Sequence, residues 1–143
     1  MPMITVQYAT PKTTTANTGL TPAIAAAVSK FTSEILKKDP NVTAINVEEG
    51  NPATWFIAGK TLVQHRQAAF WIDVRVTDGT NTREEKAAFV AAMFAAMQDL
   101  LGPLHNECYV HVDEVRGDAY GYGGLTQNER YFAGKLKVAV KAA

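Results

Sequence analysis

Hydrophobic and polar residues alternate along four short stretches of the chain, the pattern of β-strands that bury one face. Between them, apolar residues recur at the three- or four-residue spacing of a helix with one buried side. The expected strands are 3–8, 42–49, 69–77 and 108–115, and the expected helices are 20–38 and 82–101. The order strand, helix, strand is therefore predicted to occur twice.

The ends of both helices carry local signals. Thr21 is a plausible N-cap of the first helix, with Pro22 at the first helical position. Thr82 precedes the second helix and Glu85 follows three residues later, which is the spacing of a capping box. Gly102 and Pro103 end that helix.

The two halves of the chain also repeat each other with an offset of 65 residues. Matching pairs are Asn41 and Asn106, Val47 and Val112, Glu49 and Glu114, Trp55 and Tyr120, and Gly59 and Gly124. Each half alone is too small to bury both a sheet and a helix well. We therefore expect an α+β fold in which one four-stranded sheet carries two helices on one face, with parallel strands inside each unit.

We assign the whole chain, 1–143, to one domain. The two β-α-β units span about 2–62 and 67–125, and a C-terminal tail, 126–143, is expected to be helical to about residue 138. The sheet face without helices would carry Phe70 or Trp71 and Tyr109 or Val110. Such an apolar face predicts that the chain forms oligomers.

Composition narrows the class of protein. Apolar residues make up 47% of the 143 residues, so a real core is expected. The 14 basic and 14 acidic residues cancel, which argues against nucleic acid as the main partner. A single cysteine, Cys108, excludes a disulfide framework. No segment is typical of a membrane span or a signal peptide, so we expect a soluble cytoplasmic protein.

Several of these segments together resemble one known group of proteins. They are the start Met1-Pro2 before a strand, the helix start at 20–22, the segment 45–59, and the aromatic, glycine-rich segment 120–124. Over nearly its whole length the chain resembles the tautomerase superfamily, to which 4-oxalocrotonate tautomerase and macrophage migration inhibitory factor belong. Its two-unit length resembles the branch of malonate semialdehyde decarboxylase and cis-3-chloroacrylic acid dehalogenase.

The resemblance implies a trimer, no metal or organic cofactor, and catalysis by Pro2 after removal of Met1. A free N-terminal proline is a secondary amine, and burial in an apolar pocket lowers its pKa. It can then act as a general base on a carbon next to a carbonyl, or, in other members, as an acid. If Met1 is retained, the Pro2 nitrogen is an amide without basicity, and Pro2 would only begin a strand.

The resemblance further implies arginines that bind substrate carboxylates, since a guanidinium matches a carboxylate. Loop 9–19 has no arginine, and the family's second-strand arginine falls on Ala44 and Tyr109. Arg75 is the best remaining candidate, although it could instead pair with Asp73 on its own strand. Arg116 is a weaker candidate.

Aromatic residues, Tyr109 among them, and one histidine complete the candidate substrate-binding residues. Trp55 and Tyr120 lie where the family has an aromatic wall near the proline, or they pack at a subunit interface. Tyr122 could donate a hydrogen bond to an enolate oxygen. His111 could orient a substrate, or it could be an ordinary strand residue.

The leading hypothesis is an enzyme that catalyses keto–enol tautomerisation of a small 2-oxo acid or a phenylpyruvate-like compound, with Pro2 as general base. One alternative is a cofactor-free decarboxylase or hydratase of the same superfamily. Dehalogenation is disfavoured because the segment 118–122 has no match to the water-activating acid of that branch. The other alternative is a non-enzymatic trimeric binding protein.

Overall fold

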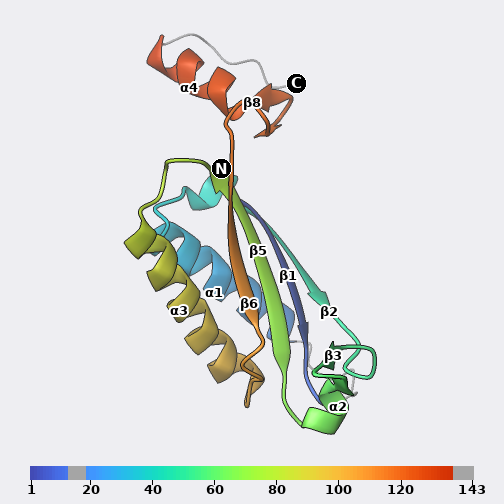
Figure 1. The fold of residues 1–143 in the computed structure, drawn as a ribbon. Helices are drawn as coiled ribbons and strands as arrows, with labels where there is room; N and C mark the ends of the chain where they lie inside the picture. Colours follow the sequence, from blue (N-terminus) through green and yellow to red (C-terminus); the bar gives the residue numbers. More distant parts are fainter. Residues whose placement is uncertain (13–18, 137–143) are drawn as a thin grey trace.

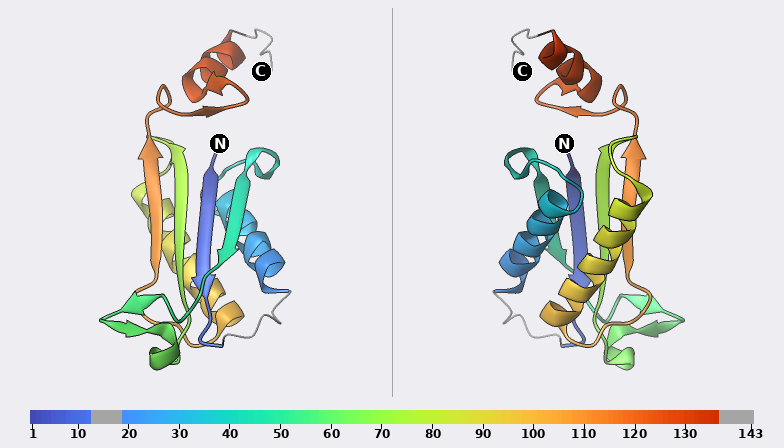
Figure 2. Two further views of the ribbon diagram at one scale, coloured as in Figure 1. Left: turned by 90° about the vertical axis from the view of Figure 1, so that its right-hand side faces the viewer. Right: turned by 90° about the vertical axis from the view of Figure 1, so that its left-hand side faces the viewer.

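The computed structural model describes residues 1–12 and 19–136, and it is built around one mixed sheet. The sheet has the strand order β2-β1-β5-β6, as Figure 2 shows. β1 pairs with β2 in parallel, β5 pairs with β6 in parallel, and the central strands β1 and β5 are antiparallel. The strand bounds are Met3–Ala9 for β1, Ala44–Glu49 for β2, Ala69–Thr77 for β5 and Tyr109–Val115 for β6. The predicted α+β fold is thus confirmed.

Two helices, α1 (Leu20–Glu34) and α3 (Arg83–Leu101), cover one face of this sheet and leave the other face open (Figure 1). The core between them is apolar and fully buried, with Tyr8, Ile24, Phe70, Phe89 and Met93 among its largest side chains. Burial of such side chains drives the packing of the two layers. In the described part of the chain, no helix has the length and hydropathy needed to cross a membrane.

The caps of the two helices differ from each other. The capping box of Thr82 and Glu85 at the start of α3 is confirmed. At α1 the N-cap is Gly19, and Thr21 lies inside the first turn, where its hydroxyl is 3.1 Å from the Tyr8 hydroxyl. The helix ends at Glu34, before the expected residue 38, and Lys37 takes a left-handed backbone conformation with φ of 58°.

Each β-α-β unit is followed by a small hairpin and a helix. We call the segment of β3 (Phe56–Ile57), β4 (Lys60–Thr61) and α2 (Leu62–His65) the first hairpin unit. The second hairpin unit consists of β7 (Gly121–Tyr122), β8 (Leu125–Thr126) and α4 (Gln127–Lys135). The expected C-terminal helix therefore exists, and its predicted extension beyond residue 136 lies outside the described residues. A short 3-10 helix, η1 (Pro40–Val42), precedes β2.

The 65-residue offset holds for individual hydrogen bonds in the two hairpin units. Thr61 and Gln64 form a capping box, and so do Thr126 and Glu129. A side-chain nitrogen of His65 lies 2.7 Å from the Ile57 carbonyl oxygen, and the equivalent Arg130 donates to the Tyr122 carbonyl at 2.8 Å. The internal repeat seen in the sequence is therefore a repeat of local structure.

The open sheet face differs from expectation, because it is not apolar over most of its area. Trp71 and Tyr109 are exposed on it as expected, at one end. Farther along the same strands its residues are Asp73, Arg75 and His111. The alternation of the strands turns valines and isoleucines toward the helices and so turns the intervening polar residues outward. An apolar open face therefore cannot be the basis for oligomer formation.

Candidate functional site

Pro2 lies at the start of β1, buried beneath a cavity of about 460 Å³. Its carbonyl oxygen accepts a hydrogen bond of 3.3 Å from the Ala44 backbone N–H, which fixes it beside the first residue of β2. The other lining residues come from η1, the start of β2 and the second hairpin unit: Asn41, Val42, Thr43, Tyr120, Gly121, Tyr122 and Gln127, with Met1 and Met3. The cavity is thus built by both halves of the chain.

Two tyrosines form the wall contributed by the second hairpin unit. The Tyr120 hydroxyl donates a hydrogen bond to the Met1 carbonyl oxygen. Burial raises the pKa of Tyr120, so its hydroxyl stays protonated and remains a hydrogen-bond donor at neutral pH. The guanidinium of Arg130 stacks over the Tyr122 ring, 3.8 Å from its centre, and holds that side chain in place.

The electrostatics of this end of the chain favour a neutral amine. Burial lowers the pKa of the Met1 amino group, and the positive charge of Lys38 lowers it further. The Lys38 Nζ is held 2.8 Å from the Thr80 hydroxyl, to which it donates a hydrogen bond. Over residues 1–12 and 19–136, which the structure describes, no side chain that lines the Pro2 cavity is charged.

The predicted site residues did not include Lys38 and Arg130, nor the polar lining residues Asn41, Thr43 and Gln127. The signal for Lys38 is topological, because a right-handed crossover returns the chain to the starting end of β1 just before β2 begins. Lys38 lies just before η1 in this connection, so the topology places its charge near the N-terminal amine. The signal for Arg130 is the repeat itself, since Arg130 corresponds to His65.

Arg75 and His111 lie in a neighbouring charged cluster on the open sheet face. The Arg75 Nε is 3.6 Å from a carboxylate oxygen of Asp113, so its ion-pair partner is Asp113 rather than Asp73. The His111 Nδ1 is 3.4 Å from a carboxylate oxygen of Asp73. These four residues, with Met3 and Thr5, line a cavity of about 210 Å³. Met3 also lines the Pro2 cavity, which makes the two cavities neighbours.

The remaining predicted residues lie elsewhere. Trp55 and Tyr109 are at the opposite end of the sheet, where Trp55 packs against Trp71 and the Tyr109 hydroxyl donates to Glu107. Arg116 is exposed and pairs with Asp118 at 2.8 Å. The chain therefore gathers Pro2, Tyr120 and Tyr122 in one cavity. Among the residues that the structure describes, no group of three histidine, cysteine or acidic side chains could hold a metal ion.

Solved structures share this arrangement of strands and helices over nearly the whole chain. A fused 4-OT described as a symmetric trimer superposes with a TM-score of 0.72 at 19% identity, covering 88% of this chain and 96% of its own. Pt0534, inactivated by 2-oxo-3-pentynoate, gives a TM-score of 0.74 at 15% identity, covering 90% and 98%. The fold is that of the tautomerase superfamily, in its fused two-unit form.

A macrophage migration inhibitory factor-like protein from Entamoeba histolytica is also similar, with a TM-score of 0.69 at 17% identity over 87% of this chain and 97% of its own. No protein-family model and no curated protein sequence matches the chain. The similarity to the tautomerase superfamily is thus one of three-dimensional structure, and the resemblance predicted from the sequence is confirmed at the level of the fold.

Proposed function

We propose that this chain catalyses keto–enol tautomerisation of a small 2-oxo acid, with the amine of Pro2 as general base once Met1 has been removed. The observation that carries this proposal is the position of Pro2, buried at the start of β1 under a cavity of about 460 Å³. Burial and the charge of Lys38 lower the pKa of the Met1 amino group, and the Pro2 amine, once Met1 is removed, would become the chain terminus in the same buried cavity. An amine that is neutral near pH 7 can accept a proton from carbon.

In the proposed reaction, the Pro2 nitrogen takes a proton from the carbon next to the substrate carbonyl. Negative charge develops on the carbonyl oxygen, which needs a hydrogen-bond donor. Removal of Met1 frees the Tyr120 hydroxyl from the Met1 carbonyl, so this hydroxyl becomes available to the substrate oxygen. Tyr122 lies on the same wall and is a second donor. Return of the proton to the other end of the enol system completes the isomerisation.

The lining of the cavity supports an aromatic monoacid as substrate. Because the lining side chains are uncharged, nothing there matches a pair of carboxylates. Valine, methionine and tyrosine side chains of the lining suit a phenyl ring. Phenylenolpyruvate is therefore favoured over 2-hydroxymuconate.

We further propose that the chain works as a homotrimer. The fused 4-OT structure that resembles it is described as a trimer. In a single chain the second hairpin unit extends beyond the sheet (Figure 1), and Tyr131, Phe132 and Leu136 are 60%, 57% and 73% exposed. Such a set of exposed apolar side chains is typical of a protein interface. These residues replace the open sheet face as the basis for the proposed assembly.

A non-enzymatic trimeric binding protein is the second candidate. It is favoured because the described residues that line the Pro2 cavity include no arginine. It also follows if Met1 is retained, because the Pro2 nitrogen is then an amide.

Two measurements on the native protein and one on a variant distinguish the enzyme from the binding protein. Intact-protein mass spectrometry should show the loss of Met1, and phenylenolpyruvate should be converted to its keto form faster than 2-hydroxymuconate. Pro2→Ala leaves a primary amine after processing, so we expect a partial loss of kcat, below the full contribution of about 10²–10⁴-fold that general acid–base catalysis makes, with a smaller effect on KM. Processed protein that accelerates neither ketonisation would contradict the enzymatic proposal and support the binding protein.

A further inference from the structure

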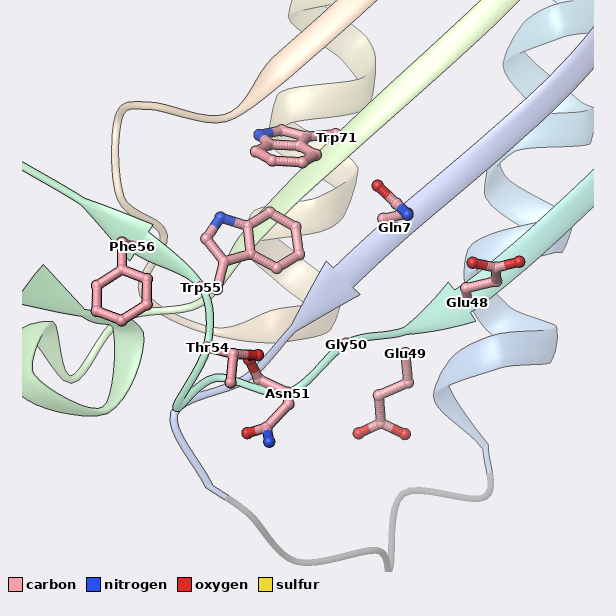
Figure 3. Close-up of a pocket in the computed structure, with 9 residues that line it drawn as sticks. All are labelled: Gln7, Glu48, Glu49, Gly50, Asn51, Thr54, Trp55, Phe56 and Trp71. Carbon is pink, nitrogen blue, oxygen red and sulfur yellow. The ribbon is translucent and has the colours of Figure 1, made fainter.

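A third cavity, of about 260 Å³, lies at the end of the sheet opposite Pro2, and Figure 3 shows the residues that line it. Its wall is formed by β1, the end of β2, β5 and the segment that leads into the first hairpin unit. The lining residues are Gln7, Glu48, Glu49, Gly50, Asn51, Thr54, Trp55, Phe56 and Trp71. None of them lines the Pro2 cavity, so this cavity belongs to no step of the proposed tautomerisation.

The base of the cavity is a row of side chains across three neighbouring strands. Gln7 of β1 pairs with Glu48 of β2 on one side and with Trp71 of β5 on the other. All three residues are exposed on the open sheet face. The pairing of the strands thus places the Gln7 amide between the Glu48 carboxylate and the Trp71 indole. The distance from one side chain to the next is set by the spacing between neighbouring strands.

Two indole rings form one wall. The rings of Trp55 and Trp71 have centres 4.6 Å apart and are tilted by 48°. Figure 3 shows Trp55 lying below Trp71 and beside the lining strands. Trp71 remains 43% exposed, so part of its ring is accessible to a ligand. The face of an indole carries negative charge density and attracts cations.

The carboxylates that line the cavity are negative, like the faces of the two indole rings. Glu48 and Glu49 are both exposed, and the lining residues in the described part of the chain include no lysine, arginine or histidine. Glu48 accepts a hydrogen bond of 3.0 Å from the Asn46 amide, which holds its carboxylate above the sheet. Within the described residues neither glutamate has an ion-pair partner at salt-bridge distance. A positive ligand would therefore be attracted both by the carboxylates and by the indoles.

We propose that this cavity binds a small organic cation, an alkylammonium or quaternary ammonium group, against Trp55 and Trp71 with Glu48 and Glu49 as counter-charges. The polar Gln7, Asn51 and Thr54 would bind hydrogen-bonding groups attached to the cation. The site needs neither removal of Met1 nor activity at Pro2.

The chain offers a direct optical test, because its only two tryptophans both line this cavity. The native oligomer is titrated with choline while intrinsic tryptophan fluorescence is recorded, with sodium chloride replaced to keep ionic strength constant. The matched neutral probe is 3,3-dimethylbutan-1-ol, which has the shape of choline without its charge. We expect a saturable fluorescence change with choline and at least about tenfold weaker binding of the alcohol, because only the cation interacts with ring faces and carboxylates.

Charge-neutralising variants identify the site without removing any packing. Glu48→Gln and Glu49→Gln should each weaken choline binding by about fivefold, as the loss of one close counter-charge in a solvent-accessible site predicts. Glu34→Gln is the control, because Glu34 is an exposed carboxylate at the end of α1, on the covered side of the sheet. It changes the net charge equally and should leave binding unchanged.

Three results would overturn the proposal: no saturable change with choline, equal binding of choline and the neutral alcohol, or equal choline binding by Glu48→Gln, Glu49→Gln and Glu34→Gln. Circular dichroism of each variant verifies that it is folded. Ketonisation of phenylenolpyruvate by the same variants provides an independent readout, which should not change.

Discussion

The two hairpin units have equivalent internal hydrogen bonds but opposite surroundings. The first unit packs against its own sheet, where Leu62 is completely buried next to Ala9 and Ala69. The second unit extends past the end of the sheet (Figure 2), and its helix α4 has no buried residue. The residue that corresponds to Leu62 is Gln127. The capping and turn residues therefore determine the internal structure of a hairpin unit. The residue at the position of Leu62 or Gln127 determines whether the unit packs against the sheet.

The two halves of the chain share their local structure, but they differ in the residues that could take part in catalysis. The position that corresponds to Pro2 in the second half is Gln67, which lies inside the chain and has an amide nitrogen. The position that corresponds to Lys38 is Pro103, which carries no charge. Only one of the two equivalent ends can therefore provide an amine, and at that end the charge of Lys38 lowers the pKa of the Met1 amino group.

The largest expected difference between the hairpin units concerns the stability of the chain. Leu62→Ala removes a fully buried side chain and should lower the free energy of unfolding by about 2–5 kcal/mol. Gln127→Ala should change it by less than about 0.5 kcal/mol, because the Gln127 side chain is only half-buried and its amide nitrogen makes no hydrogen bond in the described structure. Urea unfolding at one protein concentration measures both, and equal losses would mean that the second unit is packed as tightly as the first.

A second test addresses assembly. Replacing both Tyr131 and Phe132 with serine removes exposed apolar surface from α4, so we expect the trimer to dissociate at least about 100-fold more readily. Val63→Ser removes an exposed apolar residue from the first unit and is the matched control. Sedimentation equilibrium should show monomers for the double variant and trimers for the control. Trimers in both cases would place the interface elsewhere.

The capping boxes give a smaller effect. Thr61→Ala and Thr126→Ala each remove an N-cap hydroxyl, which costs about 1 kcal/mol of helix stability. Because α2 is tied to the core and α4 is not, Thr61→Ala should destabilise the whole chain, whereas Thr126→Ala should only unfold α4 locally. Amide hydrogen exchange distinguishes the two patterns, and faster exchange in the sheet of Thr126→Ala would contradict this assignment.

The smallest effect concerns the charge near the amine. Lys38→Gln removes a positive charge that lowers the pKa of the terminal amine, so that pKa should rise. The base is active when neutral, so the rising limb of kcat/KM against pH should move to higher pH and activity at neutral pH should fall. Lys30→Gln, on α1, is the control. An unchanged limb in Lys38→Gln would show that Lys38 does not act on the base.

The sequence predicted the sheet and its two helices well, because alternation and helical spacing report directly on which residues are buried. It predicted β5 to the residue, and the box of Thr82 and Glu85, from local signals. The prediction of an apolar open face was wrong. Alternation along a strand shows which residues share a face of the sheet, but it does not show which of the two faces the helices cover. Asp73, Arg75 and His111 are exposed as a result.

The candidate site was predictable only in part. Pro2, Tyr120 and Tyr122 meet because both halves of the chain contribute to the starting end of β1, which the repeat indicates. Trp55 was expected beside Pro2 but lies at the other end, because the first hairpin unit follows the far end of β2. Lys38 acts through space from another element, so no motif spacing marks it, and only the topology of the crossover between β1 and β2 places it near the amine.

The central claim, that the Pro2 amine is the base, is tested most directly by blocking it. Native protein is compared with a form that carries one extra alanine between Met1 and Pro2, with N-terminal masses verified and trimers confirmed by sedimentation. The account predicts that the blocked form loses nearly all ketonisation of phenylenolpyruvate while choline binding at Trp55 and Trp71 is retained. Full activity in the verified, trimeric, blocked form would show that another group transfers the proton, and His111 would then be the next residue to replace.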